Sequence, residues 1–168
     1  TGNYNISIGP ESMLGTCTGS ANVNVGRDGL RAITSGSKNV NVGNDGNRTC
    51  TTGNYNVSIG HEALFNTTTA ESNVAIGYNA LDTNTTGAQN VAIGTMALDA
   101  NTTNNNNVAV GYHALKANTG SANVAIGVNA LLANQGANYC IAIGLNALKS
   151  TTNYSDNIGI GLEAGQAI

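Results

Sequence analysis

The chain has little charge, little aromatic bulk and almost no proline. Only 9% of its 168 residues are charged and 4% are aromatic, with one proline and no tryptophan. The net charge of −3 gives no basic surface, which argues against a nucleic-acid-binding protein. A conventional globular core of this length uses more aromatic side chains. Yet 40% of the residues are hydrophobic, which is too many for a disordered chain.

Long hydrophobic runs are missing as well. No stretch approaches the roughly 20 apolar residues that a bilayer-spanning helix needs, so we expect no membrane insertion. The chain begins inside a repeat, and no signal peptide is visible at Thr1. We therefore expect residues 1–168 to be a single repeat domain that forms a segment of a longer protein.

What the chain does have is a repeat. The pentapeptide NVAIG, or a close variant of it, begins at Asn5, Asn22, Asn39, Asn56, Asn73, Asn90, Asn107, Asn123, Cys140 and Asn157. The spacing is 17 residues every time except from Asn107 to Asn123, where it is 16. The missing residue falls within residues 116–120, a loop-like stretch where deletions are tolerated.

Each copy of the pentapeptide predicts a short β-strand. The second and fourth residues are always Val or Ile and the residue between them is small, as in Val74, Ala75 and Ile76. Period-2 alternation with β-branched residues on one face is typical of a strand. Gly closes the pentapeptide in all ten copies. A glycine fixed in register indicates a positive φ or a space too small for a Cβ.

The rest of each repeat predicts a coil and neither a helix nor a hairpin. Ala80 and Leu81 represent two further columns, one small and one mostly long and apolar, followed by a polar turn such as Asn-Thr-Thr-Gly. A single helical turn between such residues is too short to stand alone. The chain has no Asn-Gly dipeptide, the strongest hairpin signal. We therefore predict an all-β fold: a parallel β-solenoid of about ten 17-residue coils, roughly 48 Å long.

In such a stack, each column of the repeat becomes a ladder along the rod. The Asn column that begins with Asn5 should stack amide on amide, as in cross-β ladders. No single coil buries enough surface to be stable, so neighbouring coils must supply each other's core.

The repeats NVAIGYNAL, NVAIGTMAL and NVAIGVNAL resemble those of trimeric autotransporter adhesin heads. The longer form GYNALDTNTTGAQNVAIG is even more similar to repeats in tail-fibre and surface-fibre proteins of phages and large viruses. The resemblance covers essentially the whole chain. It implies a left-handed β-roll, a homotrimer, and a place outside the cell, on a cell surface or on a virion. The 17-residue coil is longer than the usual adhesin-head coil.

The repeat leaves two placements of the Val and Ile columns open. In a thin coil of two strands, small residues of the Ala75 and Ala80 type would fill the interior, and the Val and Ile columns would face outward toward partner chains. In a wider coil, Val, Ile and Leu would fill the interior of a single chain, and no trimer would be required.

Histidine and acidic residues offer little chemistry. His61 and His113 lie about three coils apart in different columns, which argues against a shared metal site. Asp28 and Asp45 are equivalent and could flank a cation, but the nonapeptide calcium pattern is absent, which favours turn carboxylates. A third set, in one column but too many coils apart to act together, is Glu11, Glu62 and Glu163.

No known catalytic motif occurs: the chain lacks Gly-x-Ser-x-Gly, His-Glu-x-x-His and the phosphate-binding loop. It also lacks a nucleophile, a base and an orienting group in a common pattern. We therefore predict no catalytic, cofactor-binding or metal-binding residues and no enzymatic activity.

The cysteines and tyrosines have structural interpretations. Cys17 and Cys50 lie about two coils apart, near 10 Å, which exceeds disulfide reach. With Cys140 they are expected to be small buried hydrophobic residues or free thiols. Tyrosines could contact a receptor or a glycan through an amphipathic ring, although a structural surface role is expected; they are Tyr4, Tyr55, Tyr78, Tyr112, Tyr139 and Tyr154. Asn-x-Ser/Thr triplets matter only in a eukaryotic secretory setting.

Two functions compete. The first is a rigid shaft or head of an extracellular or virion fibre that attaches to a host cell or surface. The second is an ice-binding solenoid, suggested by the column Thr1, Thr18, Ser35, Thr52, Thr69, Thr86, Thr103 and Thr119. A flat double rank of Thr is not predicted, because the column two residues earlier is irregular: Thr16, Ile33, Cys50, Thr67, Asn84, Asn101 and Ala117.

Overall fold

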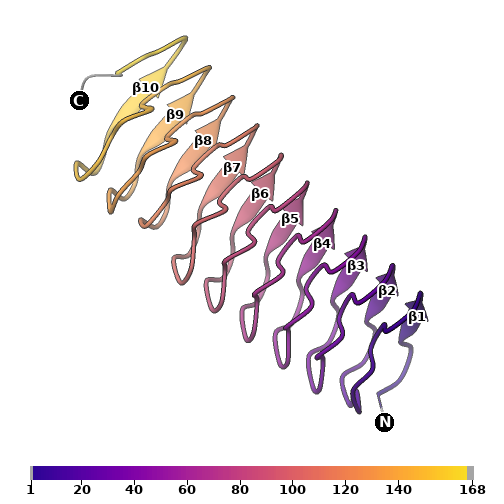
Figure 1. Ribbon diagram of the computed structural model, residues 1–168. Coiled ribbons are helices and arrows are strands. Elements are labelled where there is room, and N and C mark those ends of the chain that lie inside the picture. Colours follow the sequence, from indigo (N-terminus) through magenta and orange to yellow (C-terminus); the bar gives the residue numbers. More distant parts are fainter. Residues whose placement is uncertain (1, 166–168) are drawn as a thin grey trace.

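The computed structural model, which describes residues 2–165, is a β-solenoid of about nine turns with one strand per repeat. The ten strands form one parallel sheet in chain order and lie side by side along a rod (Figure 1). The strands are β1 (Ile6–Ile8), β2 (Val23–Val25), β3 (Val40–Val42), β4 (Val57–Ile59), β5 (Val74–Ile76), β6 (Val91–Ile93), β7 (Val108–Val110), β8 (Val124–Ile126), β9 (Ile141–Ile143) and β10 (Ile158–Ile160). The predicted fold class is confirmed.

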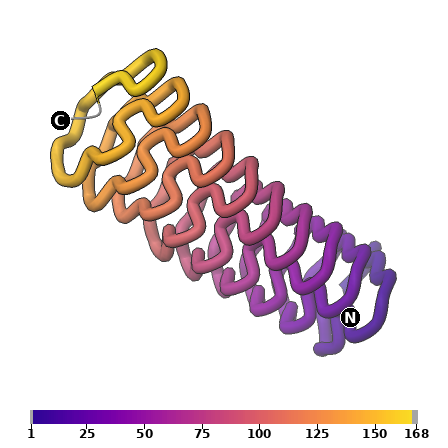
Figure 2. Tube along the Cα trace, turned by 45° about the horizontal axis from the view of Figure 1, so that its top comes forward, coloured from indigo at the N-terminus to yellow at the C-terminus, as the bar shows by residue number. Residues whose placement is uncertain are grey.

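The strands pair in register along the whole rod. Val74 of β5 pairs with Val91 of β6, and the 16-residue repeat does not shift this pattern, because Val108 of β7 still pairs with Val124 of β8. The tube in Figure 2 shows coils of similar shape stacked without a break. The side chain of Asn118 also keeps its place in the stack, so the missing residue is absorbed after Asn118.

Each coil has one strand, unlike the thin two-strand coil of the first alternative, because the wall opposite the sheet is a chain of turns. Within each coil, residues such as Asn79 and Leu81 have positive φ (51° and 53°) while the residue between them does not. The N–H of Asn79 therefore donates to His61 O of the preceding coil, and the N–H of Leu81 donates to Ala97 O of the next coil. Turns with these hydrogen bonds close the coil as a second strand would. No helix in residues 2–165 is long and apolar enough to cross a membrane.

The predicted Asn ladder is present and does more than stack amides. Oδ1 of Asn56 accepts from both the backbone N–H and the Nδ2 of Asn73, at 3.0 and 3.2 Å. Nδ2 of Asn73 also donates to Gly87 O at 2.9 Å, across its own coil. Each Asn thus ties two coils together and fastens the turn that leads back to the sheet. Because these amides are buried, the bonds offset a large desolvation cost.

The glycine that closes each strand meets both predicted requirements. Gly94 has φ of +132°, and a Cβ built on it would lie 2.5 Å from Gly111 O in the next coil. Gly43 is nearly identical, with φ of +139° and 2.5 Å to Gly60 O. Any side chain here would strain the backbone and collide with the neighbouring coil.

The buried residues show which apolar columns face the interior, and each of the two predicted arrangements was partly right. Ala75, Ala80 and Leu81 are fully buried, and their columns form the continuous core of the rod. The Val and Ile side chains at either end of each strand instead face outward, as the repeated burial pattern of the strands shows. Small residues and Leu thus fill the coil, while the β-branched columns lie on its surface.

Candidate functional site

The outer face of the sheet carries the most distinctive surface of the molecule. We call the Val and Ile residues at the ends of all ten strands the outer stripe. Its first column is half-buried in β2–β9, and its second column is more open, with Val42 42% and Ile93 37% exposed. Since successive strands pair in register, both columns run straight along the rod. The result is a contiguous apolar surface, a feature that commonly accompanies interaction sites in proteins.

The turns carry a second Asn ladder that the sequence analysis missed. Nδ2 of Asn101 donates to Asn84 Oδ1, Asn118 to Asn101 and Asn134 to Asn118, at 3.3, 3.2 and 2.8 Å. The ladder covers only part of its column, because the early coils hold Thr16, Ile33, Cys50 and Thr67 at the same position. In the short repeat the member of this column is Asn118 and not Ala117. Counting 11 residues from Asn107 would have found it.

The threonines do not form two free ranks. The hydroxyl groups of Thr51, Thr68 and Thr85 each donate to the carbonyl of the equivalent residue one coil further on, at 3.1–3.3 Å. These side chains serve the coil-to-coil bonding. In the neighbouring column, Thr52 and Thr86 are exposed at a bend of the chain, and Thr1 lies outside the described residues.

Asp28 and Asp45 are nearly buried and paired with arginine. Arg27 reaches Asp45 at 3.2 Å, Arg31 reaches Asp28 at 2.9 Å, and Arg48 lies 3.6 Å from Asp45. The carboxylates are therefore neutralised within the chain, which favours the interpretation as turn carboxylates over a cation site. Sequence analysis had not connected them with the arginines, which stand one residue before or three residues after each Asp.

Two acids face each other further along the rod, where equivalent positions of adjacent coils hold Asp82 and Asp99. Burial, followed by the charges of Asp99 and Glu62, raises the pKa of Asp82 to about 6. Burial also raises the pKa of Asp99, although Lys116 in the next coil opposes this. No arginine pairs with Asp82 or Asp99 among the described side chains, and Lys116 is the nearby cation that acts on Asp99.

The other residues singled out by sequence lie apart. His61 stacks on Tyr78 with ring centres 5.8 Å apart, and His113 stacks on Tyr112 at 3.7 Å. Burial, followed by the charge of Lys116, lowers the pKa of His113. Of the three acids in one column, Glu11 pairs with Arg31 at 3.1 Å, Glu62 lies beside His61, and Glu163 is exposed.

All three cysteines are free thiols, as expected. Cys50 and Cys140 are buried and Cys17 is half-buried. Burial raises the pKa of Cys50 to about 11, so its thiol is protonated at neutral pH. A protonated thiol is a poor nucleophile and a poor metal ligand.

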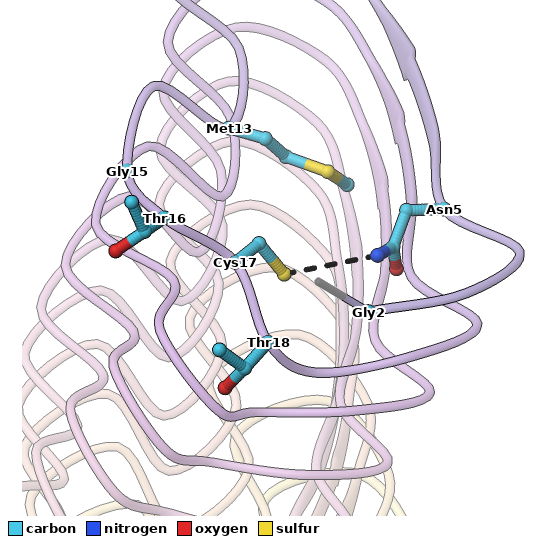
Figure 3. Close-up of a pocket in the computed structure, with 7 residues that line it drawn as sticks. All are labelled: Gly2, Asn5, Met13, Gly15, Thr16, Cys17 and Thr18. Atoms are coloured by element: carbon cyan, nitrogen blue, oxygen red, sulfur yellow. Dashed lines mark hydrogen bonds between the residues drawn. The ribbon is translucent and has the colours of Figure 1, made fainter.

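One cavity opens in the first coil, where Asn5 faces Cys17 and Met13 (Figure 3). Nδ2 of Asn5 donates to Cys17 Sγ at 3.8 Å. Met13 lies one repeat before Leu30, which is fully buried in the next coil. The cavity is therefore the interior cross-section of the rod and not a separate pocket. Within residues 2–165, no three His, Cys, Asp or Glu side chains are grouped so that they could hold a metal ion.

In comparisons with known proteins, the chain matches no protein-family model, no curated protein and no solved structure. The fold itself defines the class of protein: a β-solenoid built from tandem 17-residue repeats.

Proposed function

We propose that this chain is the rigid repeat region of an extracellular or virion fibre, in which three copies associate along their outer stripes, and that the fibre attaches to a host cell or surface. The observation that carries the proposal is the outer stripe. The ten strands present aliphatic side chains in straight columns, in a chain that carries little charge. Aliphatic surface of this length is stabilised when another apolar surface covers it.

The spacing of the stripe favours a second copy of the same chain as its cover. The aliphatic side chains recur at the strand spacing of about 4.8 Å over roughly ten coils. A partner that fills the gaps between them along the whole rod needs the same spacing, which another solenoid of this sequence has. Parallel copies around a threefold axis would each present one edge of the stripe to one neighbour and one edge to the other, which closes the assembly. We include left-handed coiling in this proposal, because the resemblance to fibre repeats implies it.

A rod held by in-register hydrogen bonds suits a shaft. Backbone bonds and two Asn ladders link neighbouring coils along the rod, so bending it would distort many bonds at once. The exposed tyrosines, among them Tyr55 and Tyr139 at 54% and 66%, offer amphipathic rings to a receptor or a surface glycan.

The test is the native mass, measured by sedimentation equilibrium over a wide concentration range. We expect a species with three times the mass of the chain. The variant I93T/I126T/I143T keeps β-branched side chains on the stripe but removes apolar surface. It should dissociate to a folded monomer, while the control T86S/T103S on an exposed bend should stay trimeric. A wild-type chain that is monomeric at every concentration would overturn the proposal.

Ice binding remains a second candidate because of the exposed column that includes Thr52, Thr86 and Thr103. It is less favoured because this column lies at a bend and its neighbouring hydroxyls are used between coils. Thermal hysteresis of the purified chain decides it: a freezing-point depression without a matching change in melting point would support ice binding, and its absence would remove it.

A further inference from the structure

A third column lies next to the outer stripe and changes character along the rod. It holds the residue that follows each repeat glycine, and we call it the flank column. From the first coil to the last it reads Pro10, Arg27, Asn44, His61, Tyr78, Thr95, Tyr112, Val128, Leu145 and Leu162. After Pro10 the column is polar or charged at Arg27 and Asn44. From His61 to Tyr112 it is aromatic except for Thr95, and from Val128 onward it is aliphatic, while the outer stripe stays Val or Ile throughout.

The flank column widens the apolar surface in the last coils. Val128 and Leu145 are 42% and 46% exposed, and each follows a stripe residue, Ile126 or Ile143, by two positions. Two residues of chain span at most about 7 Å, so the Cα atoms of the two exposed columns lie within this distance of each other. The apolar surface is thus three columns wide from β8 onward, but two columns wide at β2 and β3.

The outer stripe by itself is small for a stable interface. Its two columns are about 7 Å apart on a rod of about 48 Å, which gives roughly 350–500 Å² per chain once side-chain width is included. Stable interfaces commonly bury about 800 Å² per partner. Additional apolar surface is needed, and the aliphatic part of the flank column is the surface that adjoins the stripe.

In the early coils the flank column is already occupied within its own chain. Arg27 lies 3.2 Å from Asp45 and 3.7 Å from Asp28. The backbone N–H of Arg27 also donates to Asn44 Oδ1 at 3.2 Å. Moving these groups into an apolar contact would cost desolvation and break their pairing. A second copy therefore gains less by covering this end.

We propose that copies of this chain are held together mainly through Val128, Leu145 and the stripe residues beside them, with the early coils contributing weak polar contacts. The inference rests on the proposed trimer and adds which part of the rod determines its affinity. The occupant of the widened surface is the equivalent part of a second copy, because it continues the stripe whose spacing only such a copy matches.

The experiment compares substitutions that the flank column itself uses elsewhere. V128T/L145N introduces the residue types found at Thr95 and Asn44, and these side chains are exposed, so the coil should stay folded. We expect the concentration at half-association, measured by sedimentation, to rise at least tenfold. The reverse change, T95L, should lower the concentration at half-association several-fold. The matched control A100N/A133T changes two residues on a different column and should leave it unchanged.

The outcomes separate the two proposals. A wild-type chain that never associates overturns the fibre trimer itself. A wild-type trimer whose affinity is the same in V128T/L145N, T95L and A100N/A133T overturns the flank inference and leaves the trimer standing. Circular dichroism at a concentration where every variant is monomeric checks folding. If V128T/L145N unfolds there, T95L still decides: no tightening with T95L overturns the inference, and tightening supports it.

Discussion

The coils of β2–β4 and those of β5–β9 share one backbone but fill it differently. In the second group, Ala occupies the centre of each strand and Ala also faces it from the turn, as with Ala92 and Ala97. In the first group, Asn24, Asn41 and Ser58 occupy the strand centre, and the facing residues are Gly29, Gly46 and Ala63. A larger residue on one wall is thus compensated by a smaller one on the other, as close packing requires.

The polar interior of the first group is hydrogen-bonded, which explains why it is tolerated. Nδ2 of Asn41 donates to Asn24 Oδ1 at 2.6 Å, and the hydroxyl of Ser58 donates to Asn41 Oδ1 at 2.8 Å. Nδ2 of Asn41 also donates to Gly43 O at 3.0 Å. Buried amides with partners in the stack cost little, whereas unpaired ones are expensive. The backbone of the coil is therefore compatible with either interior.

The largest loss of stability is expected at the repeat glycine, which both groups share. Gly43→Ala and Gly94→Ala each force a Cβ into 2.5 Å of a carbonyl oxygen at a strongly positive φ. Each should lower the free energy of unfolding by at least about 3 kcal/mol, and by the same amount in both groups. Urea unfolding at one protein concentration measures it. Gly136→Ala, with nothing closer than 3.7 Å, is the control and should cost less. Unequal costs for the first two would mean that the backbones differ.

The compensation between walls is tested by a double-mutant cycle. A Cβ on Gly46 would lie 2.0 Å from Asn41 Oδ1, so Gly46→Ala alone should destabilise by about 2–3 kcal/mol. Asn41→Ala alone should also destabilise, because it leaves a cavity and unpairs Ser58. The double variant has the Ala–Ala interior of the later coils and should recover about 1–3 kcal/mol relative to additivity. Additive losses would contradict the idea of matched walls.

The side-chain amide of Asn47, in the first group, is buried without a hydrogen-bond partner. Asn47 occupies the column of Leu30 and Leu64, is fully buried, and has both side-chain polar atoms unpaired. Asn47→Leu should therefore raise the free energy of unfolding by about 1–3 kcal/mol, measured by thermal or urea unfolding. The matched control is Asn101→Leu, whose amide bonds to Asn84 and to Asn104 O, and it should be destabilising. No gain from Asn47→Leu would indicate a partner for this amide.

The two groups should differ in pH dependence. Asp28 and Asp45 of the first group are paired with arginines, whereas Asp82 has a pKa raised to about 6, first by burial and then by Asp99. Between the unfolded value of 3.8 and about 6, the folded chain binds more protons at Asp82, so stability should fall as pH rises and level off above 6.

After a discount for solvent screening of this half-exposed group, the loss should be on the order of 1 kcal/mol. Unfolding of wild type and Asp82→Asn at pH 4.5 and 7.5 measures it, and Asp82→Asn should lose most of the difference. A pH dependence that survives unchanged in Asp82→Asn would assign it to other groups.

The smallest change in stability is expected at the residues with positive φ, which occur in both groups. Ala21 is exposed with φ of 58°, while Ala32 is exposed and is not among the residues with positive φ. Ala21→Gly should be neutral or stabilising by up to about 1 kcal/mol, because relief of the left-handed conformation offsets the greater entropy of Gly in the unfolded chain. Ala32→Gly should cost about 0.5–1 kcal/mol. Equal effects of the two substitutions in urea unfolding would argue against strain at Ala21.

Sequence periodicity alone determined the coil length, the parallel in-register strands, the first Asn ladder and the role of the repeat glycine. These follow from one column pattern, because in a stack every residue meets its own equivalent one coil away. The spacing of the cysteines also predicted that Cys17 and Cys50 form no disulfide with each other. The second Asn ladder could also have been predicted, because its members lie 11 residues after the start of their repeats, including Asn118 in the short repeat.

Only the tertiary structure decided which residues face inward. Alternation within a strand predicts two faces but does not say which is the interior, and Val and Ile favour a buried face by hydrophobicity. The turns of positive φ bring the wall that carries Ala80 and Leu81 so close to the sheet that only residues the size of Ala75, or Asn24 opposite a Gly, fit between them. The β-branched side chains are left outside because the coil is too narrow to hold them, and this places the apolar stripe on the surface.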